Sequence, residues 1–383
     1  MKPSEVHEVP VDAGGDRELR LRLRRFPAAH PNSAAARERG AVLMFHGGNT
    51  LSDTFLLPEG GITAYLAERD FDVWLVDWRT SPYIVDSLLQ TRAPLGGSER
   101  AERSLYTLAH AAREDVPRVL AEVRRHIGGD APLSVLGHCM GGGVMAIAVA
   151  LGLVARFDVK NIVLSTMGLF YEVPWNGWMK AEDFIVERIP HQAPRCRGIN
   201  PKKPETWPEV MRKACTRWPT AWLPPGTSPA ARMLQYITFM FGQPYARELL
   251  HPSITDETLL EQFGTMHLGL FLYAAQLVRR GYAAELDAPD VLDRPRLASE
   301  RPAAPVPGHF LIPEPFRRHR MTMLVAGENQ LWHRDSMDLM HDWLLSHDVP
   351  STKLVHLGYR IQELFWGARA KEEVYPGIFA ALR

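Results

Sequence analysis

The sequence lacks the features that mark several large classes of protein. Its 383 residues include only three cysteines, Cys139, Cys196 and Cys215, and none belongs to a CxxC pair. This low number argues against a disulfide framework and a cysteine-based metal site, and it favours a reducing compartment. The polar N-terminus shows no apolar segment of a secretory signal. We therefore expect a cytoplasmic protein that requires no metal and no cofactor.

Net charge is lacking as well. Forty-four basic and forty-four acidic side chains cancel, so no overall positive field attracts a phosphate backbone or an anionic bilayer. Residues 133–155 carry no charge and are long enough to span a membrane, but they include five glycines and begin like a strand. We expect a buried strand and a buried helix there, with no stable membrane insertion and no nucleic-acid partner.

What the sequence does contain is an alternation of strand and helix patterns. Residues 17–26 alternate leucine with charge, which predicts an antiparallel strand with one exposed face. Residues 104–127 have the apolar spacing of an amphipathic helix, and a closing helix is expected over 370–382. Apolar runs of five or six residues predict parallel strands covered on both faces. These runs lie at 41–45, 72–77, 132–136, 161–165, 321–326 and 352–357.

The strand pattern disappears between residues 167 and 318. This region is rich in tryptophan, and residues 231–241 and 259–280 have helical spacing. We predict an α/β core formed by residues 1–166 and 319–383, with residues 167–318 inserted as a helical cap between the sixth and seventh strands. Trp175 and Trp178 are expected to line an apolar chamber for a bulky acyl group. Alternatively, the aromatic residues of the cap pack only on one another.

The clearest chemical motif lies where the strand at 132–136 meets the following helix. Gly137-His138-Cys139-Met140-Gly141 has the G-x-C-x-G pattern of a nucleophile elbow, in which the glycines allow a strained turn. The turn places Cys139 at a helix N-terminus, which favours the thiolate. The alternative is a small buried cysteine beside a tight glycine turn.

A second glycine motif follows the strand at 41–45. His46-Gly47-Gly48-Asn49 occupies the place where this type of fold supplies one N–H group of an oxyanion hole. The second N–H group would come from Met140, directly after the nucleophile. The alternative is an ordinary glycine loop at the end of a strand.

These motifs resemble the α/β-hydrolase superfamily, and within it the hydrolase-like domains associated with cholesterol-oxidase-type GMC oxidoreductases. A cysteine at the elbow is also familiar in polyhydroxyalkanoate synthases, which are acyltransferases. The resemblance implies an α/β-hydrolase fold, with a mostly parallel sheet and a helical cap, and acyl-group chemistry. The oxidoreductase itself is absent, because no GxGxxG motif occurs. The matching segments are 72–78, 137–141, 162–174, 237–242, 327–329 and 358–359.

The sequence departs from this superfamily at the catalytic histidine. Similar proteins have Gly-Tyr-Gly-His-x-Asp after the last strand, whereas residues 358–363 here read Gly-Tyr-Arg-Ile-Gln-Glu. Ile361 cannot transfer a proton. Arg360 would bind a substrate carboxylate or simply fill space, and Glu363 occupies the position of the aspartate. Glu328 is the acid available after the seventh strand.

Other histidines could replace the missing base. His46 lies in the oxyanion segment, and His333 follows the seventh strand near Glu328. His138 adjoins the nucleophile, but successive residues of an elbow point in different directions. We retain His46 and His333 as candidates beside the alternative that both are structural.

Loss of the histidine affects a cysteine less than a serine, because a thiol ionises more readily. Water still requires a base, so we predict an acyltransferase, a cyclase or a slow hydrolase or thioesterase. The expected substrate is a bulky hydrophobic ester or thioester, which a carrier or CoA could hold. Two alternatives remain: a catalytically silent relative that binds a hydrophobic ligand or a partner enzyme, and a non-hydrolytic lyase or cyclase. The sequence does not predict the oligomeric state.

Overall fold

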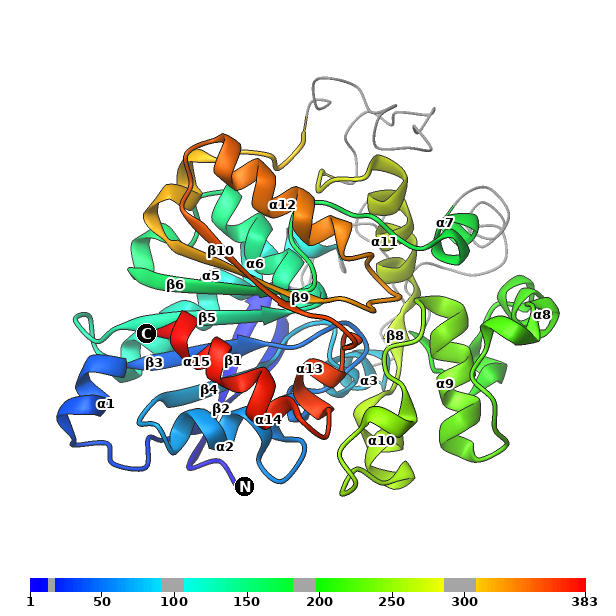
Figure 1. Cartoon of the computed structure of the whole chain (residues 1–383), viewed down its shortest axis with the longest axis horizontal. Coiled ribbons are helices and arrows are strands. Elements are labelled where there is room, and N and C mark those ends of the chain that lie inside the picture. Colours follow the sequence, from blue (N-terminus) through cyan, green and yellow to red (C-terminus); the bar gives the residue numbers. More distant parts are fainter. Residues whose placement is uncertain (13–17, 91–106, 182–197, 286–307) are drawn as a thin grey trace.

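A mixed eight-stranded sheet forms the centre of the computed structural model (Figure 1), which describes residues 1–12, 18–90, 107–181, 198–285 and 308–383. The strand order is β1-β2-β4-β3-β5-β6-β9-β10. The strands are β1 (Glu5–Asp12), β2 (Glu18–Phe26), β3 (Ala41–Phe45), β4 (Asp72–Asp77), β5 (Leu133–His138), β6 (Val159–Ser165), β9 (Arg320–Ala326) and β10 (Ser351–His356).

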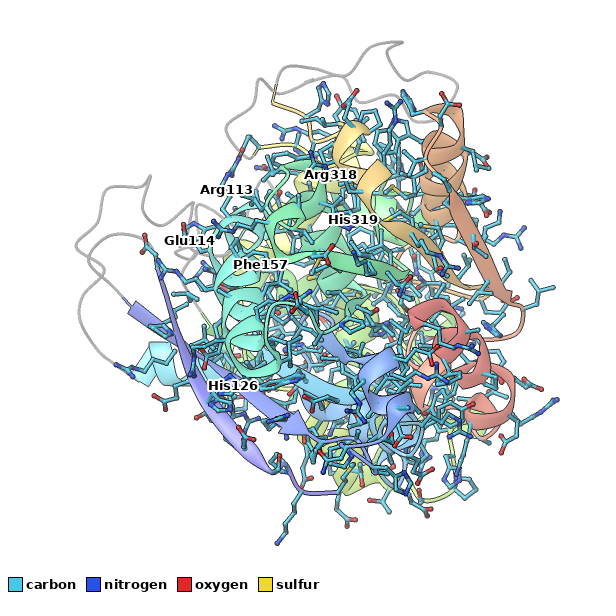
Figure 2. The ribbon with its side chains drawn as sticks, turned by 90° about the vertical axis from the view of Figure 1, so that its left-hand side faces the viewer. Arg113, Glu114, His126, Phe157, Arg318 and His319 are labelled. Carbon is cyan, nitrogen blue, oxygen red and sulfur yellow. The ribbon has the colours of Figure 1, made fainter. Side chains whose placement is uncertain are left out.

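The six strands from β4 to β10 run parallel, as their apolar composition predicts. The predicted strand over 17–26 is confirmed as β2, which pairs antiparallel with both β1 and β4. Sequence analysis missed β1, whose exposed face is polar. Figure 2 shows this hairpin in blue below α5, the helix that carries the labelled Arg113, Glu114 and His126.

Helices cover both faces of the sheet (Figure 1). On one face α5, α6 and α12 pack over one hydrophobic cluster, and on the other α2 and the C-terminal helices pack over a second. The predicted closing helix is interrupted: residues 370–382 form α14 and α15, and Pro376 in the first turn of α15 lacks the N–H that a continuous helix requires. The helices outside the segment between β6 and β9 are α1 (Ala34–Arg39), α2 (Gly61–Ala67), α3 (Pro82–Gln90), α5 (Leu108–Ile127), α6 (Met140–Ala150), α12 (Asp335–Ser346), α13 (Glu363–Trp366), α14 (Ala370–Glu373) and α15 (Tyr375–Leu382).

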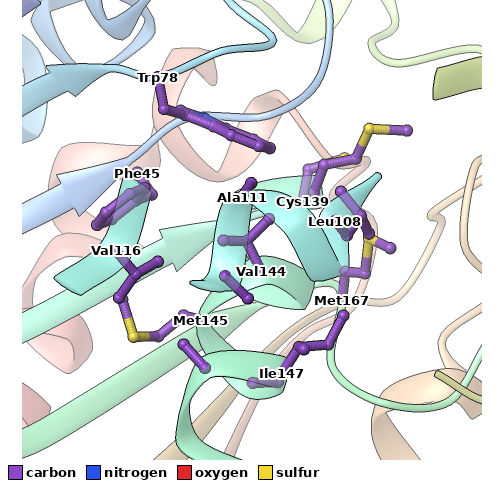
Figure 3. Packing of buried hydrophobic residues seen from close by; sticks show 14 of the residues in the cluster. Phe45, Trp78, Leu108, Ala111, Val116, Cys139, Val144, Met145, Ile147 and Met167 are labelled. Atoms are coloured by element: carbon purple, nitrogen blue, oxygen red, sulfur yellow. The ribbon is translucent and has the colours of Figure 1, made fainter. Parts of the chain in front are cut away.

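Residues 133–155 are the predicted buried strand and helix. Every residue of α6 is buried, and Figure 3 shows Cys139 at the start of this helix, with Val144, Met145 and Ile147 packed along it. Within the described ranges, no helix is both long and apolar enough to cross a membrane.

The segment between β6 and β9, here called the insertion, lies beside the sheet (Figure 1). The helix expected over 259–280 is wrong: α10 ends at Gln262, Phe263 bridges to Thr50, and Met266–His267 form a strand before α11 begins. Periodicity alone does not reveal such pairing, because the partners come from distant segments. The insertion contains α7 (Trp175–Ala181), β7 (Gly198–Ile199), α8 (Glu209–Arg217), α9 (Pro229–Met240), α10 (Asp256–Gln262), β8 (Met266–His267) and α11 (Leu268–Arg280).

Candidate active site

Cys139 occupies a strained turn between β5 and α6. Its backbone has φ 53° and ψ −126°, a conformation that costs a non-glycine residue on the order of 1–3 kcal/mol. The turn is held because the Cys139 N–H donates to Ser165 O at 2.8 Å and Cys139 O accepts from Gly142 N at 2.8 Å. The predicted elbow geometry is therefore present.

The glycines of the elbow fit spaces that a side chain would overfill. A Cβ on Gly137 would lie 2.6 Å from Gly141 O, and one on Gly141 would lie 2.5 Å from Phe45 O. The loop after β3 is in contact with the nucleophile, since a Cβ on Gly47 would be 3.1 Å from Cys139 Cβ and 3.6 Å from its Sγ. Close backbone packing thus brings the two glycine motifs together at the sulfur.

Three N–H groups near Cys139 favour its thiolate form. They belong to the backbone of Met140 and Gly48 and to the side chain of Trp332. Burial raises the pKa of the thiol to about 11, although each of the three hydrogen bonds lowers it. The expectation of a ready thiolate is therefore wrong, because removal from water outweighs the helix N-terminus and the N–H donors.

The sulfur borders a small apolar cavity of about 60 Å³ between the sheet and the insertion. Cys139 is 6% exposed and is part of the cavity wall. The lining residues are Gly48, Cys139, Met140, Val173, Gly177, Lys180, Ala181, Met240, Phe241, Phe271, Ala274, Ala275, Val278, Leu331 and Trp332.

Comparison with known proteins agrees with this geometry. A family model described as the alpha/beta hydrolase fold matches residues 40–198. A carboxyl esterase from Bacillus coagulans, solved in complex with glycerol, is 12% identical, with 99% of this chain and 97% of that chain covered and a TM-score of 0.58. A lipase in its open form is also 12% identical, with 99% and 98% covered and a TM-score of 0.50. This protein has the α/β-hydrolase fold. Among curated protein sequences, none matches the chain.

The chain has no proton acceptor at the position where the resemblance places the histidine. Ile361 is 1% exposed and packs in the same hydrophobic cluster as Cys139. Both carboxylate oxygens of Glu363 accept backbone hydrogen bonds, from Ala246 N at 2.5 Å and Arg360 N at 2.8 Å. Burial raises the pKa of this carboxyl group. Glu363 thus joins the loop after β10 to the insertion, and it does not line the cavity.

The candidate histidines of this α/β-hydrolase chain also lie outside the cavity wall. His46 is fully buried, its Nδ1 is 2.6 Å from Gly47 O, and burial lowers its pKa to about 4. His138 pairs with Ser165 Oγ at 3.0 Å, and burial lowers its pKa to about 3. His333 is partly exposed and lies 3.1 Å from Asp335. None of the three is among the residues that line the cavity.

Other predicted site residues also point elsewhere. Glu328 is exposed, and Trp175 is 68% exposed at the start of α7; neither is among the residues that line the cavity. Trp178 is buried outside the lining. Asn49 has a left-handed backbone with φ 58° and a buried side chain, and Arg360 is half-buried. Cys196 lies outside the described residues.

Among the cavity residues that the sequence did not predict, Trp332 and Lys180 are the two whose side chains carry an N–H group. Trp332 reaches the sulfur because Asn329 Oδ1 accepts from Leu331 N at 3.0 Å and Trp332 N at 3.4 Å, which fixes the loop after β9. Lys180 has the appearance of a surface lysine in the sequence, but it is 3% exposed. The only feature of the sequence that points to burial of Lys180 is the number of tryptophans in the surrounding segment.

Proposed function

We propose that this protein transfers acyl groups from a bulky hydrophobic ester or thioester through Cys139. The observation that supports this most directly is the position of the sulfur, on an elbow, in an apolar cavity, beside the N–H groups of Gly48 and Met140. The same N–H groups can stabilise the oxyanion that forms when the sulfur attacks a carbonyl. The esterase and lipase neighbours share the fold, and the reaction class is our inference for this chain.

The expected reaction has two steps. Cys139 Sγ forms a bond to the carbonyl carbon, the bond to the leaving oxygen or sulfur breaks, and the thiol proton ends on the leaving alcohol or thiol. An acceptor amine, alcohol or thiol then attacks the acyl-enzyme and releases Cys139. An acceptor within the same substrate gives a cyclase.

Hydrolysis should be the slow branch. Among the described cavity residues there is no imidazole and no carboxylate, so nothing of that kind activates water. Loss of a general base commonly slows such a step by ~10²–10⁴-fold. The acyl-enzyme should therefore accumulate when no better acceptor is present.

A second candidate is a silent relative that binds a hydrophobic ligand or a partner enzyme. The raised pKa of Cys139 and the buried Ile361 favour it. The sequence resemblance to domains associated with GMC oxidoreductases makes such an oxidoreductase the partner to test first.

Intact-protein mass spectrometry separates the two candidates. The protein is incubated with a long-chain acyl thioester, and the adduct is mapped by peptide digestion. We expect one acyl group on Cys139, which persists without an acceptor and disappears when an amine is added. If Cys139 is not acylated, acyl transfer through this residue is rejected and the catalytically silent relative is the remaining candidate of the two.

Cys215 provides a matched control. It is 6% exposed, like Cys139, and burial raises its pKa to about 12. It does not lie on an elbow. Cys215→Ala should retain the adduct, whereas Cys139→Ala should lose it.

A further inference from the structure

Lys180 is a basic side chain in an otherwise apolar cavity wall. It comes from α7, and its Nζ donates to Phe239 O at 2.7 Å in the last turn of α9. The amine also lies over the Trp218 and Phe239 rings, at 5.6 and 6.0 Å from their centroids. A carbonyl at a helix C-terminus and two aromatic faces favour a cation at this place.

Nevertheless, no carboxylate among the described residues pairs with this amine. An ammonium group has three donors, and Phe239 accepts one of them. A buried charge without a partner is costly, and burial lowers the pKa of Lys180 to about 7. A ligand that offers an anionic oxygen would supply what the chain does not.

Lys180 and Cys139 come from different elements that line the same cavity. Cys139 lies with Gly48, Met140 and Trp332 on the side formed by the sheet loops. Lys180 lies on the insertion, and the thiol that acts electrostatically on its amine is Cys215, with no such effect from Cys139. Apolar side chains, among them Phe241, Phe271 and Val278, complete the wall of the same cavity.

We propose that Lys180 binds a carboxylate carried by the acyl substrate at the end remote from the carbonyl that Cys139 attacks. The substrate class is then a hydrophobic acyl chain with a reactive ester or thioester at one end and an anionic group at the other. This inference rests on the proposed function for the reactive end only, because binding of the carboxylate does not require Cys139.

Carboxylate binding should depend on pH in a defined direction. Only the ammonium form of Lys180 attracts the carboxylate, and its pKa in the free protein is about 7. Above that pH, Lys180 must take up a proton when the ligand binds, so the affinity should fall about tenfold between pH 6 and pH 8. A ligand without the carboxylate should show no such change.

Calorimetric titration of the Cys139→Ala protein tests the inference without turnover. The probes are monomethyl esters of α,ω-dicarboxylic acids over a range of chain lengths, each compared with its dimethyl ester at pH 6. For the chain length that fits, the monoester should bind at least tenfold more tightly. Equal affinities at every length would overturn the inference.

Variants identify the residue. In the same background, Lys180→Met should weaken the monoester at least tenfold and leave the diester unchanged. Lys213→Met is the matched control, since Lys213 is exposed on α8 and pairs with Glu209. Equal weakening of both probes by Lys180→Met would show that the lysine only supports the packing.

A measurement on the unmodified chain guards against misfolding of the variant. Acetic anhydride acetylates Lys180 when its amine is neutral and free. The monoester should protect Lys180 in a peptide map, and the diester should not. If the monoester protects Lys180 but Cys139 is never acylated, the proposed function fails and the inference about Lys180 stands. If Cys139 is acylated but the monoester does not protect Lys180 selectively, the proposed function stands and the inference about Lys180 fails.

Discussion

The loops after β3 and β5 and the loops after β9 and β10 bring different chemistry to the same site. The first pair supplies a sulfur on a strained turn and two backbone N–H groups directed at it. The second pair supplies the Trp332 side chain at the sulfur and the buried Ile361. The nucleophile elbow and its backbone N–H groups have the geometry expected of an α/β-hydrolase fold. The loops after β9 and β10 carry different side chains, with Ile361 at the position of the usual histidine.

The difference follows from where each group comes from. Any residue that follows the nucleophile donates an N–H to the oxyanion hole, so the fold itself provides that part. The acid and the base are side chains, and one substitution removes either of them. Retained backbone geometry is therefore weaker evidence for hydrolysis than for acyl-enzyme formation.

The largest expected effect comes from placing a general base at position 361, which should change the rate of hydrolysis of the acyl-enzyme. Ile361→His places an imidazole at the position of the usual base, and burial should keep it neutral and able to accept a proton. We expect hydrolysis of the Cys139 acyl-enzyme to accelerate by about 10²–10⁴-fold. Single-turnover mass spectrometry measures this lifetime.

Ile361→Gln controls for polarity at the same buried position. It introduces a polar side chain of similar size that does not titrate. If the acyl-enzyme lives equally long in the His and Gln variants, Ile361 does not face the acyl group and the comparison between the two pairs of loops fails.

The next effect concerns the stability of the elbow. A Cβ on Gly141 would lie 2.5 Å from Phe45 O and 2.6 Å from His46 O, both backbone atoms that cannot easily move. Gly141→Ala should lower the free energy of unfolding by about 3 kcal/mol, as overpacking does. Urea denaturation measures it. Gly129→Ala, where nothing lies within 4 Å of the added Cβ, should change it by less than about 0.5 kcal/mol.

The raised pKa of Cys139 gives a pH prediction. Only the thiolate reacts with iodoacetamide, and burial holds the pKa near 11. The alkylation rate of Cys139, followed by peptide mapping, should therefore rise about tenfold per pH unit from pH 7 to pH 9. A plateau below pH 8 would mean that the N–H donors outweigh burial and that the elbow alone activates the sulfur.

The sequence predicted the parts of this molecule that depend on local pattern. The apolar runs located six parallel strands, and the two glycine motifs meet at the sulfur as expected. Local pattern did not reveal the break between α10 and α11, because bridges to Thr50 and to β7 come from elsewhere in the chain.

The unpredicted site residues share a physical cause. Lys180 is buried where α7 contacts α11 and its Nζ donates to Phe239 O of α9, and Asn329 shapes the loop that carries Trp332. The pKa of Cys139 was misjudged for the same reason, since the degree of burial is a tertiary property. Spacing along the chain carries none of this information.

The smallest expected effect concerns Trp332, on the loop after β9. Trp332→Phe removes one donor to the Cys139 sulfur while retaining an aromatic ring against Tyr171. A hydrogen bond of this kind contributes about 1 kcal/mol, so the alkylation rate of Cys139 at pH 8 should fall about fivefold. Trp218→Phe is the matched control, because the buried Trp218 indole nitrogen has no hydrogen-bond partner within the described residues. Equal rates in the two variants would mean that the loop after β9 only fills space, and that the loops after β3 and β5 alone determine the reactivity of the sulfur.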